Sequence, residues 1–361
     1  MRLLVIVVIA GTGCGRLGFD ALADDAGSDI PTDATGAVDG DDAPPALSCG
    51  TLAPTCGPTG TSSCCESPVV TGGTFYRSFD VSGDGMYLDP SFPATVSTFR
   101  LDKYEVTVGR FRRFVGAGGT QASPPPAGAG ARALDGMTDQ GGWDPSWNGN
   151  LTTDTASLIA AINCDVAYQT WTDTPGANES RPMNCLTWYE AMAFCVWDGG
   201  YLPTEAESMY AASGGDLQRA YPWSNPPSSV AVDDTLASYS DVTKGCFGDG
   251  IEGCALTDLV RVGSKPGGDG RWGQSDLGGN VWEWVLDGYA GLDADPCTDC
   301  ANVTATASRV VRGGSFGSDA TYLRAASRDD LAPMIRADNR GVRCARALIA
   351  GSSRGHAPRP P

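Results

Sequence analysis

The sequence predicts one large domain that combines strands with a few helices, is rich in loops and is held together by disulfide bonds. Of its 361 residues, 48 are glycine and 24 are proline, which favours long loops over a helical bundle. The 13 cysteines are typical of a cross-linked exported protein, and several short runs alternate apolar with polar residues as strands do. A hydrophobic content of 41% supplies enough apolar side chains for a sizeable core.

The first 13 residues have the pattern of a lipoprotein signal peptide. Arg2 provides a positive start, residues 3–10 are apolar but too few to span a bilayer, and small residues lead to Cys14. We expect cleavage before Cys14 and lipidation of its thiol; the alternative is ordinary cleavage that leaves a spare thiol. We therefore expect an exported protein, anchored in the cell envelope by its lipid. The outer membrane is favoured because Gly15, not an aspartate, follows the cysteine.

The remaining chain divides into four predicted segments. Residues 14–47 form an acidic disordered tether, because a segment with eight aspartates and few large apolar side chains cannot offset the entropy of ordering. Residues 48–65 hold four closely spaced cysteines and are predicted to form a small Cys-rich cap. The main domain spans residues 66–348. Residues 349–361 are predicted to be a disordered tail.

The charge of the chain restricts its partners. The formal net charge is −18 and the isoelectric point is about 4.3. A protein this acidic is repelled by phosphate backbones and by anionic membrane surfaces. We therefore expect no nucleic-acid partner, and contact with a membrane only through the N-terminal lipid.

Twelve of the 13 cysteines remain when Cys14 is set aside, an even number that allows six disulfides. Cys297 and Cys300 lie in an acidic loop without helix signals, so we interpret them as a local staple and not as a redox pair at a helix start. The only histidine, His356, lies in the tail. This argues against a zinc site and against a Ser-His-Asp hydrolase.

Local patterns predict several elements of the main domain. Residues 187–190 and 204–207 each form a capping box that starts a helix, and a weaker helix is predicted after Thr107. We interpret Glu205 and Glu207 as first-turn residues that complement the helix dipole, and not as catalytic acids. Residues 116–182 are predicted to form long loops. Strands are predicted at residues 73–79, 96–104, 309–312 and 341–344.

Eight segments, in order along most of residues 68–346, together resemble the signature motifs of the formylglycine-generating enzyme (sulfatase-modifying factor) family. The segments are VTGGTF (70–75), FRLDKYEVT (99–107), NCLTW (184–188), GYLPTEAE (200–207), YPW (221–223), DLGGNVWEW (276–284), RVVRGGSF (309–316) and NRGVRCA (339–345). The chain departs from the usual motifs at Val108, Tyr201 and Ser208. The resemblance implies a single α+β domain related to C-type lectins, with little regular secondary structure.

The resemblance also implies which residues would carry chemistry. Enzymes of this family oxidise a sulfatase cysteine to formylglycine with O2, at a Cu(I) ion held by two cysteines shortly after the RGGS motif. Those two positions are Ser318 and Leu323 here. Because Cu(I) prefers soft thiolate ligands, we expect no copper site and no catalytic residues.

Two further features are implied by the same resemblance. A structural Ca²⁺ would be bound by the side chains of Asp276 and Glu283 and the carbonyls of Gly279 and Val281, hard oxygen ligands on a tight turn. The alternative is that this turn is held by hydrogen bonds alone. Cys195 and Cys344 occupy positions that are disulfide-bonded in the resembled enzymes. A bond between them would close a long loop and stabilise the folded state by about 4–5 kcal/mol.

Six arginines make the end of the domain locally basic. Either they form internal ion pairs, which we favour, or they bind an anionic ligand. The six are Arg312, Arg324, Arg328, Arg336, Arg340 and Arg343.

The sequence supports three functional hypotheses. We favour a non-catalytic module that binds a peptide, a glycan or an envelope protein, because loops on a rigid scaffold are common recognition surfaces. The alternatives are a formylglycine-generating oxidase with an altered metal site and a purely structural envelope protein. Fold alone does not decide between them.

Overall fold

The structure is a computed structural model that describes residues 46–348, apart from residues 51, 54, 135, 136, 293, 294 and 305. The predicted signal peptide at 1–13, Cys14, almost all of the tether and the tail at 349–361 lie outside the described residues. Within the described ranges, no helix has both the length and the apolar character needed to cross a membrane.

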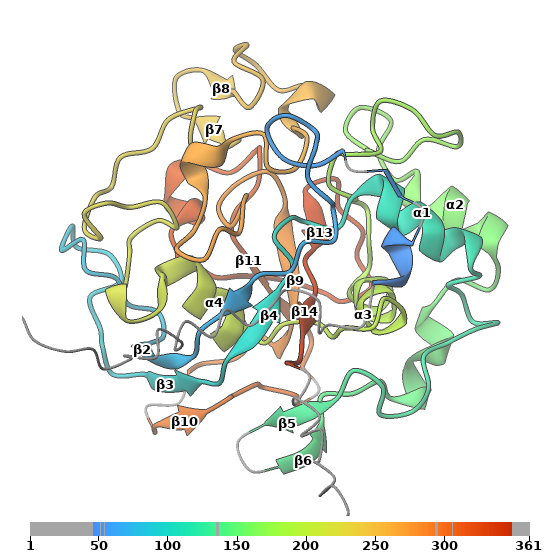
Figure 1. The fold of residues 1–361 in the computed structure, drawn as a ribbon, viewed down its shortest axis with the longest axis horizontal. Helices are drawn as coiled ribbons and strands as arrows, with labels where there is room; N and C mark the ends of the chain where they lie inside the picture. The colour runs from blue at the N-terminus through green and yellow to red at the C-terminus, as the bar shows by residue number, and fades with distance from the viewer. Residues whose placement is uncertain are drawn as a thin grey trace, which may run out of the picture. The chain divides into compact units, whose positions relative to one another are not determined.

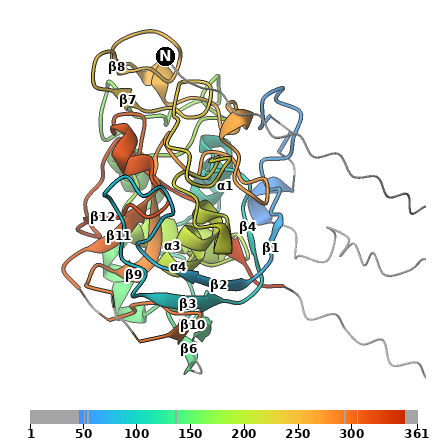
Figure 2. The ribbon, with the colours of Figure 1, turned by 90° about the vertical axis from the view of Figure 1, so that its left-hand side faces the viewer.

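Short strands build five small sheets in the described part of the chain (Figure 1). The strands are β1 (Val69–Val70), β2 (Gly73–Tyr76), β3 (Pro93–Val96), β4 (Phe99–Leu101), β5 (Arg132–Leu134), β6 (Met137–Gln140), β7 (Ser240–Asp241), β8 (Gly245–Cys246), β9 (Trp282–Gly288), β10 (Cys297–Thr298), β11 (Arg309–Arg312), β12 (Asp329–Leu331), β13 (Arg340–Val342) and β14 (Ala345–Arg346). The largest sheet has the order β12-β11-β9-β13, in which β9 pairs antiparallel with β11 and parallel with β13. Figure 2 shows β11 and β12 side by side at one edge of this sheet.

Within residues 46–348, four α-helices are described beside these sheets. They are α1 (Val108–Gly116), α2 (Thr155–Ile162), α3 (Trp188–Trp197) and α4 (Glu205–Ser213). Both predicted capping boxes are present at the starts of α3 and α4. At α3 the Thr187 hydroxyl accepts the Glu190 N–H at 3.2 Å, and the Glu190 carboxylate accepts the Thr187 N–H at 3.1 Å. The two reciprocal bonds satisfy backbone donors that would otherwise lack a partner.

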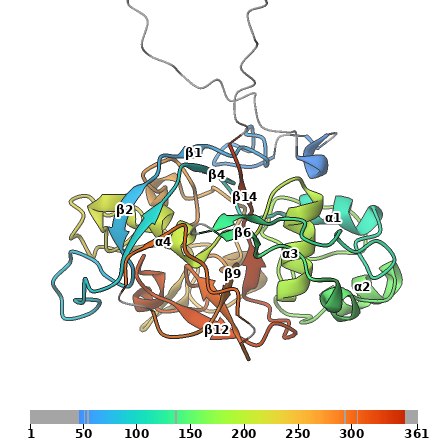
Figure 3. The same cartoon turned by 90° about the horizontal axis from the view of Figure 1, so that it is seen from below.

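The strand β9 lies at the centre of the core, and all of its residues are buried. Figure 3 shows α3 on one side of β9 and α4 on the other. The indole N–H of Trp188 on α3 donates to the Val285 carbonyl of β9 at 2.8 Å, so helix and strand are joined by a hydrogen bond as well as by packing. A continuous apolar core of this kind positions the loops that connect the elements.

Six disulfides staple the described residues. They are Cys49–Cys65, Cys56–Cys64, Cys164–Cys185, Cys195–Cys344, Cys246–Cys254 and Cys297–Cys300. The bond between Cys195 and Cys344 joins α3 to the segment between β13 and β14 across a sequence separation of 149 residues. This is the pair that the family resemblance implied.

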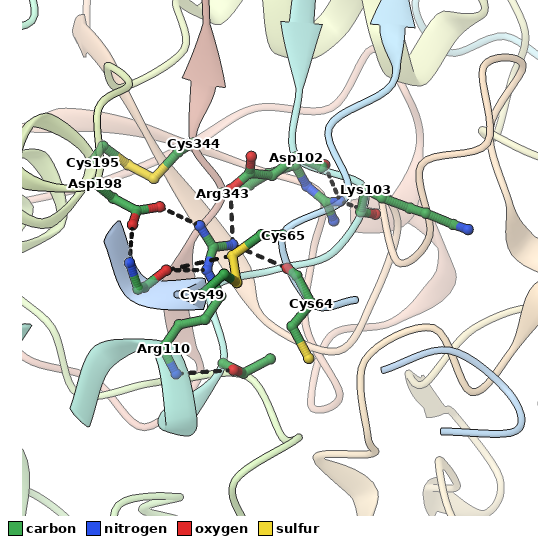
Figure 4. A network of polar contacts seen from close by, with 12 residues as sticks. Cys49, Cys64, Cys65, Asp102, Lys103, Arg110, Cys195, Asp198, Arg343 and Cys344 are labelled. Carbon is green, nitrogen blue, oxygen red and sulfur yellow. Dashed lines mark hydrogen bonds and ion pairs between the residues drawn. A yellow bond between two sulfur atoms is a disulfide. The ribbon is translucent and has the colours of Figure 1, made fainter. Parts of the chain in front are cut away.

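The cap at 48–65 is tied to the main domain by a buried network of charges (Figure 4). Asp198 accepts the Ser48 N–H at 2.7 Å, and the Arg110 guanidinium donates to the Ser48 hydroxyl at 3.0 Å and to the Cys64 carbonyl at 3.3 Å. Arg110 also pairs with Asp102 at 2.8 Å and with Asp198 at 2.7 Å. These contacts place the cap in the same compact unit as the main domain.

Some local predictions were wrong in extent. The strand expected at 73–79 ends at Tyr76 as β2, and the one expected at 96–104 is divided between the last residue of β3 and the shorter β4, Phe99–Leu101. The stretch 116–182, expected to be loops, contains β5, β6 and the helix α2. The side chain of Asp154 caps α2 by accepting the Ser157 N–H at 2.8 Å.

Candidate functional site

The segment that follows β11 carries Ser318 and Leu323, the two residues predicted to occupy the copper-ligand positions of the resembled enzymes. We call residues 315–323 the post-β11 strip. Its first part is a serine turn, in which the Ser315 N–H donates to the Ser318 hydroxyl at 3.1 Å and the two hydroxyl oxygens lie 3.0 Å apart. The Ser318 carbonyl accepts the Ser240 N–H at 2.8 Å. Ser318 is therefore a structural member of a turn.

Leu323 ends the strip as a core residue. Its side chain is only 1% exposed and packs in a cluster with Tyr221 and Tyr239. Its Cδ1 atom also lies against Gly314, where an added Cβ would come within 2.7 Å of it. Every cysteine in the described ranges is disulfide-bonded. The strip thus offers a hydroxyl and a buried hydrocarbon where a thiolate pair would be needed.

The exposed edge of the strip is aromatic. Tyr322 is 45% exposed, and its ring meets the Trp282 ring edge-on with 5.8 Å between centroids. The Arg340 guanidinium carbon lies 5.2 Å from the centre of the same indole. The Tyr322 ring can contact a ligand by packing, whereas Trp282 is buried beneath it and already engaged by Arg340.

The predicted calcium residues lie on a buried turn at 276–283, which we call the acidic turn. The Asp276 carboxylate accepts the Gly263 N–H at 2.6 Å. Glu105 packs against the same turn and accepts the amide of Asn280 at 2.6 Å and the Val281 N–H at 3.2 Å. Burial raises the pKa of Asp276 to about 6, and burial together with the Asp276 charge raises the pKa of Glu105 well above its usual value.

The acidic turn satisfies its charge largely from within the protein. Both oxygens of Glu283 accept from the buried Arg343 guanidinium, at 2.8 to 3.2 Å. In the described ranges, no three or more His, Cys, Asp or Glu side chains form a group that could hold a metal ion. A Ca²⁺ bound by the four expected groups would have to share the Glu283 carboxylate with the Arg343 guanidinium. The positive charge of that guanidinium would repel the ion. Calcium at this turn stays a prediction.

A separate cavity of about 530 Å³ opens at the N-terminus of α4, and we call it the α4 cavity. Its walls come from Glu205 on α4, from the end of β9 with residues 290–292, from Cys297, residues 300–304 and Thr306, and from Arg77 and Arg328. Neither the post-β11 strip nor the acidic turn lines it. Its volume lies within the range of small-molecule sites.

The α4 cavity contains a compact set of charges. Glu205 forms two hydrogen bonds with Arg328, at 2.7 and 2.8 Å. Asp287 accepts the backbone N–H groups of Glu205 and Asn302, each at 2.7 Å. Burial, helped by the neighbouring Glu205 charge, raises the pKa of Asp287 to about 6. The acids of the cavity are thus held by donors from the protein itself.

Comparison with known proteins identifies the family. The model of the sulfatase-modifying factor enzyme 1-like domain matches residues 53–348. The chain belongs to this family. The match begins inside the cap, in agreement with the contacts that join the cap to the main domain.

The relatives of this sulfatase-modifying-factor domain include active and inactive proteins. The formylglycine-generating enzyme of Mus musculus is 28% identical over 274 residues, which cover 71% of this chain and 68% of that enzyme. The inactive C-alpha-formylglycine-generating enzyme 2 of Bos taurus is 29% identical over 286 residues, covering 76% and 85%. The structure of PvdO from Pseudomonas aeruginosa aligns with a TM-score of 0.54 at 20% identity, over 79% of this chain and 95% of PvdO, which supports the fold alone.

The structure brings together only some of the predicted site residues of this sulfatase-modifying-factor domain. The four calcium positions share one turn, and Cys195 meets Cys344, whereas Ser318 and Leu323 point into different surroundings. The α4 cavity was not predicted, since its charged residues come from segments far apart in the sequence. The sequence placed Glu205 in the first turn of a helix and Arg328 in a locally basic segment, but it did not predict that the two side chains form an ion pair.

Proposed function

We propose that this sulfatase-modifying-factor domain is a non-catalytic ligand-binding module of an exported lipoprotein. The observation that carries the proposal is the structure of the post-β11 strip, where Ser318 belongs to a hydrogen-bonded turn and Leu323 to the apolar core. A hydroxyl is a poor ligand for Cu(I), and a buried isobutyl group is no ligand. Oxygen activation at this place would lack its metal.

The family relationship is compatible with a loss of chemistry on a retained fold. A relative named as inactive covers as much of this chain as the active relatives do, so membership of the family does not imply the oxidation reaction. Function follows from the site and not from the fold. The Tyr322 ring supports binding, because an exposed aromatic ring provides contact area at a low cost in conformational entropy, and the buried Trp282 ring packs against it.

The proposal extends to location and partners. Six disulfides in the described residues suit an oxidising compartment. They pair twelve of the 13 cysteines with one another, and the thirteenth is Cys14. We place the lipid on Cys14 and the protein in the cell envelope, with the outer membrane preferred. A peptide, a glycan or another envelope protein is the partner, reached by a domain that the acidic tether holds away from the membrane.

The test is a count of free thiols in the denatured, unreduced mature protein, combined with a Cu(I) titration of the native protein. We expect no alkylated cysteine and no stoichiometric copper binding. A double variant, Ser318→Cys with Leu323→Cys, serves as a positive control for the titration. Two free thiols with tight copper binding in the natural sequence would overturn the proposal and favour a formylglycine-generating oxidase.

A further inference from the structure

Arg309, on β11, is a buried arginine without an acidic partner. Other arginines of the described residues also lie over aromatic rings, and each of those named next forms an ion pair with a carboxylate. They are Arg110, Arg112, Arg132, Arg271, Arg324, Arg328 and Arg340. The guanidinium carbon of Arg309 lies 4.0 Å from the centre of the Trp188 ring and 5.8 Å from that of Trp147. In the described part of the chain, however, no carboxylate pairs with it, so its charge is offset by the ring faces alone at contact distance.

The hydrogen-bond donors of Arg309 are only partly used. The residue is 6% exposed, and its Nη1 donates to the Leu286 carbonyl at 3.0 Å. The Nε–H is buried without a partner, while Nη2 has no partner among the described residues and keeps some exposure to solvent. Burial lowers the pKa of Arg309, and the charges of Tyr189 and Asp287 oppose this shift. Asp287 forms no ion pair with it, because both oxygens of that carboxylate accept backbone N–H groups. An anion that reaches Nη2 would supply both a hydrogen bond and a counter-charge.

Two aromatic side chains beside Arg309 also have unused polar groups. Trp147 and Tyr189 are partly exposed, and the centre of each ring lies 5.2 Å from that of the buried Trp188. Among the described residues, neither the Trp147 indole N–H nor the Tyr189 hydroxyl has a hydrogen-bond partner, whereas Trp188 uses its N–H on the Val285 carbonyl. We call Trp147, Trp188, Tyr189 and Arg309 the Arg309 collar. It does not line the α4 cavity, and it combines apolar ring surface with free donors for one anionic group.

The composition of the Arg309 collar favours a side chain of a partner protein as its ligand. Tryptophan, tyrosine and arginine are the residue types that contribute most to protein–protein binding, through ring packing and charge-assisted hydrogen bonds. The net charge of the whole chain is −18, which repels a partner segment with many acidic residues. We infer that the collar binds a single Asp or Glu side chain of a partner protein, flanked by apolar residues, with its carboxylate on Arg309 and Tyr189. This inference rests on the proposed binding function and names the chemistry of the partner.

Binding is tested with the capped tripeptide acetyl-Leu-Glu-Leu-amide on the mature full-length protein. Acetyl-Leu-Gln-Leu-amide has the same shape without the charge, and acetate has the charge without the apolar groups. Calorimetry gives the dissociation constant, and the Nε–H resonance of Arg309 in a ¹⁵N NMR spectrum reports on the guanidinium itself. We expect saturable binding of the Glu peptide with a dissociation constant on the order of 1 mM or tighter, a shifted Arg309 resonance, and binding about tenfold or more weaker for the Gln peptide and for acetate.

Two variants and a matched control separate the collar from the rest of the surface. Tyr189→Phe removes only a hydroxyl and Arg309→Gln removes the charge, and each is expected to weaken binding of the Glu peptide about tenfold while the Gln peptide changes little. Arg309 is buried, so its replacement can lower stability, and Tyr189→Phe supplies the independent reading. Arg112→Gln is the control, because Arg112 also lies over an indole ring, 4.2 Å from the centre of Trp171, but is paired with Glu179. This variant should bind the Glu peptide as the natural protein does.

Each outcome decides the inference. Equal affinity for the Glu and Gln peptides, equal affinity for the Glu peptide and acetate, binding that survives both collar variants, or no saturable binding would overturn it. A protein with free thiols and bound copper would instead refute the proposed function and leave the collar result standing. Absence of peptide binding in a protein without free thiols would refute only the present inference.

Discussion

Replacement of Arg110 by methionine removes the centre of the buried network that joins the cap to the core. The guanidinium is 2.8 Å from Asp102 and 2.7 Å from Asp198, and all three side chains have no solvent exposure. Methionine keeps an unbranched apolar stem of similar length but no charge. After the change, the remaining ion-pair partner of both carboxylates in this network is Arg346, which lies 3.2 Å from Asp102 and 2.7 Å from Asp198.

The expected loss of stability is large because one negative charge becomes uncompensated in a dry environment. Removing one partner of a buried ion pair lowers the free energy of unfolding by about 3–5 kcal/mol. Arg110 and Arg346 lower the pKa of Asp198 against the effect of its burial, so loss of Arg110 also raises that pKa. For a domain of this size, about 2 °C per kcal/mol gives a fall in Tm of roughly 6–10 °C.

The matched control is Arg112→Met on the same helix. Arg112 pairs with Glu179 at 2.7 Å, but these side chains are 18% and 23% exposed, so the expected loss is below about 1 kcal/mol. Urea unfolding and calorimetry with the disulfides intact measure both variants. Arg110→Met should also expose the Cys49–Cys65 bond to reductants, because Ser48 loses a partner beside it. Equal stability of the two variants would refute the reasoning.

Three further outcomes are expected. Because the pKa of Asp287 is about 6 in the folded protein against 3.8 when unfolded, the folded state binds more protons between these values. Stability should therefore fall as pH rises from 4 to above 6, by up to about 3 kcal/mol; an Asp287→Asn variant with an equally steep Tm–pH profile would contradict this. Replacing Cys195 and Cys344 together by alanine should lower the free energy of unfolding by about 4–5 kcal/mol, and a loss below 1 kcal/mol in urea would show that the long loop contributes little. Calcium at the acidic turn predicts a fall in Tm with EGTA that Ca²⁺ but not Mg²⁺ reverses, and an unchanged Tm would exclude the ion.

Features encoded within a few residues were predictable from the sequence. The capping boxes of α3 and α4 require only a threonine and a glutamate three positions apart, and both form as expected. The helix α2 carried a comparable signal in Asp154, with Leu158 and Ile162 buried one turn apart, but glycines and prolines on both sides obscured it. The lengths of β2 and β4 depended on their partners, which alternation of apolar residues does not reveal.

The partners of charged residues were the least predictable feature. Each of the six arginines near the end of the domain has an acidic partner, which supports internal ion pairing over a free basic patch. The separation between Arg328 and Glu205 is 123 residues, and that between Arg324 and Asp80 is 244. Glu205 lies in the first turn of α4, where the dipole interpretation expected it, and its carboxylate also pairs with Arg328, which no local pattern indicated. Such pairings follow from topology, which no local pattern contains.

The post-β11 strip shows how the position of Leu323 contributes to the packing of the fold. Leu323 fills space between Tyr221, Tyr239 and Gly314, so the position has become part of the packing of the fold. Replacing a buried leucine by a smaller residue lowers stability by a few kcal/mol, on the order of 2–5 when alanine is introduced. A cysteine at this position would therefore be expected to weaken the core. Because Leu323 is part of the apolar core, a ligand is more readily received at accessible places such as the α4 cavity and the exposed Tyr322 ring.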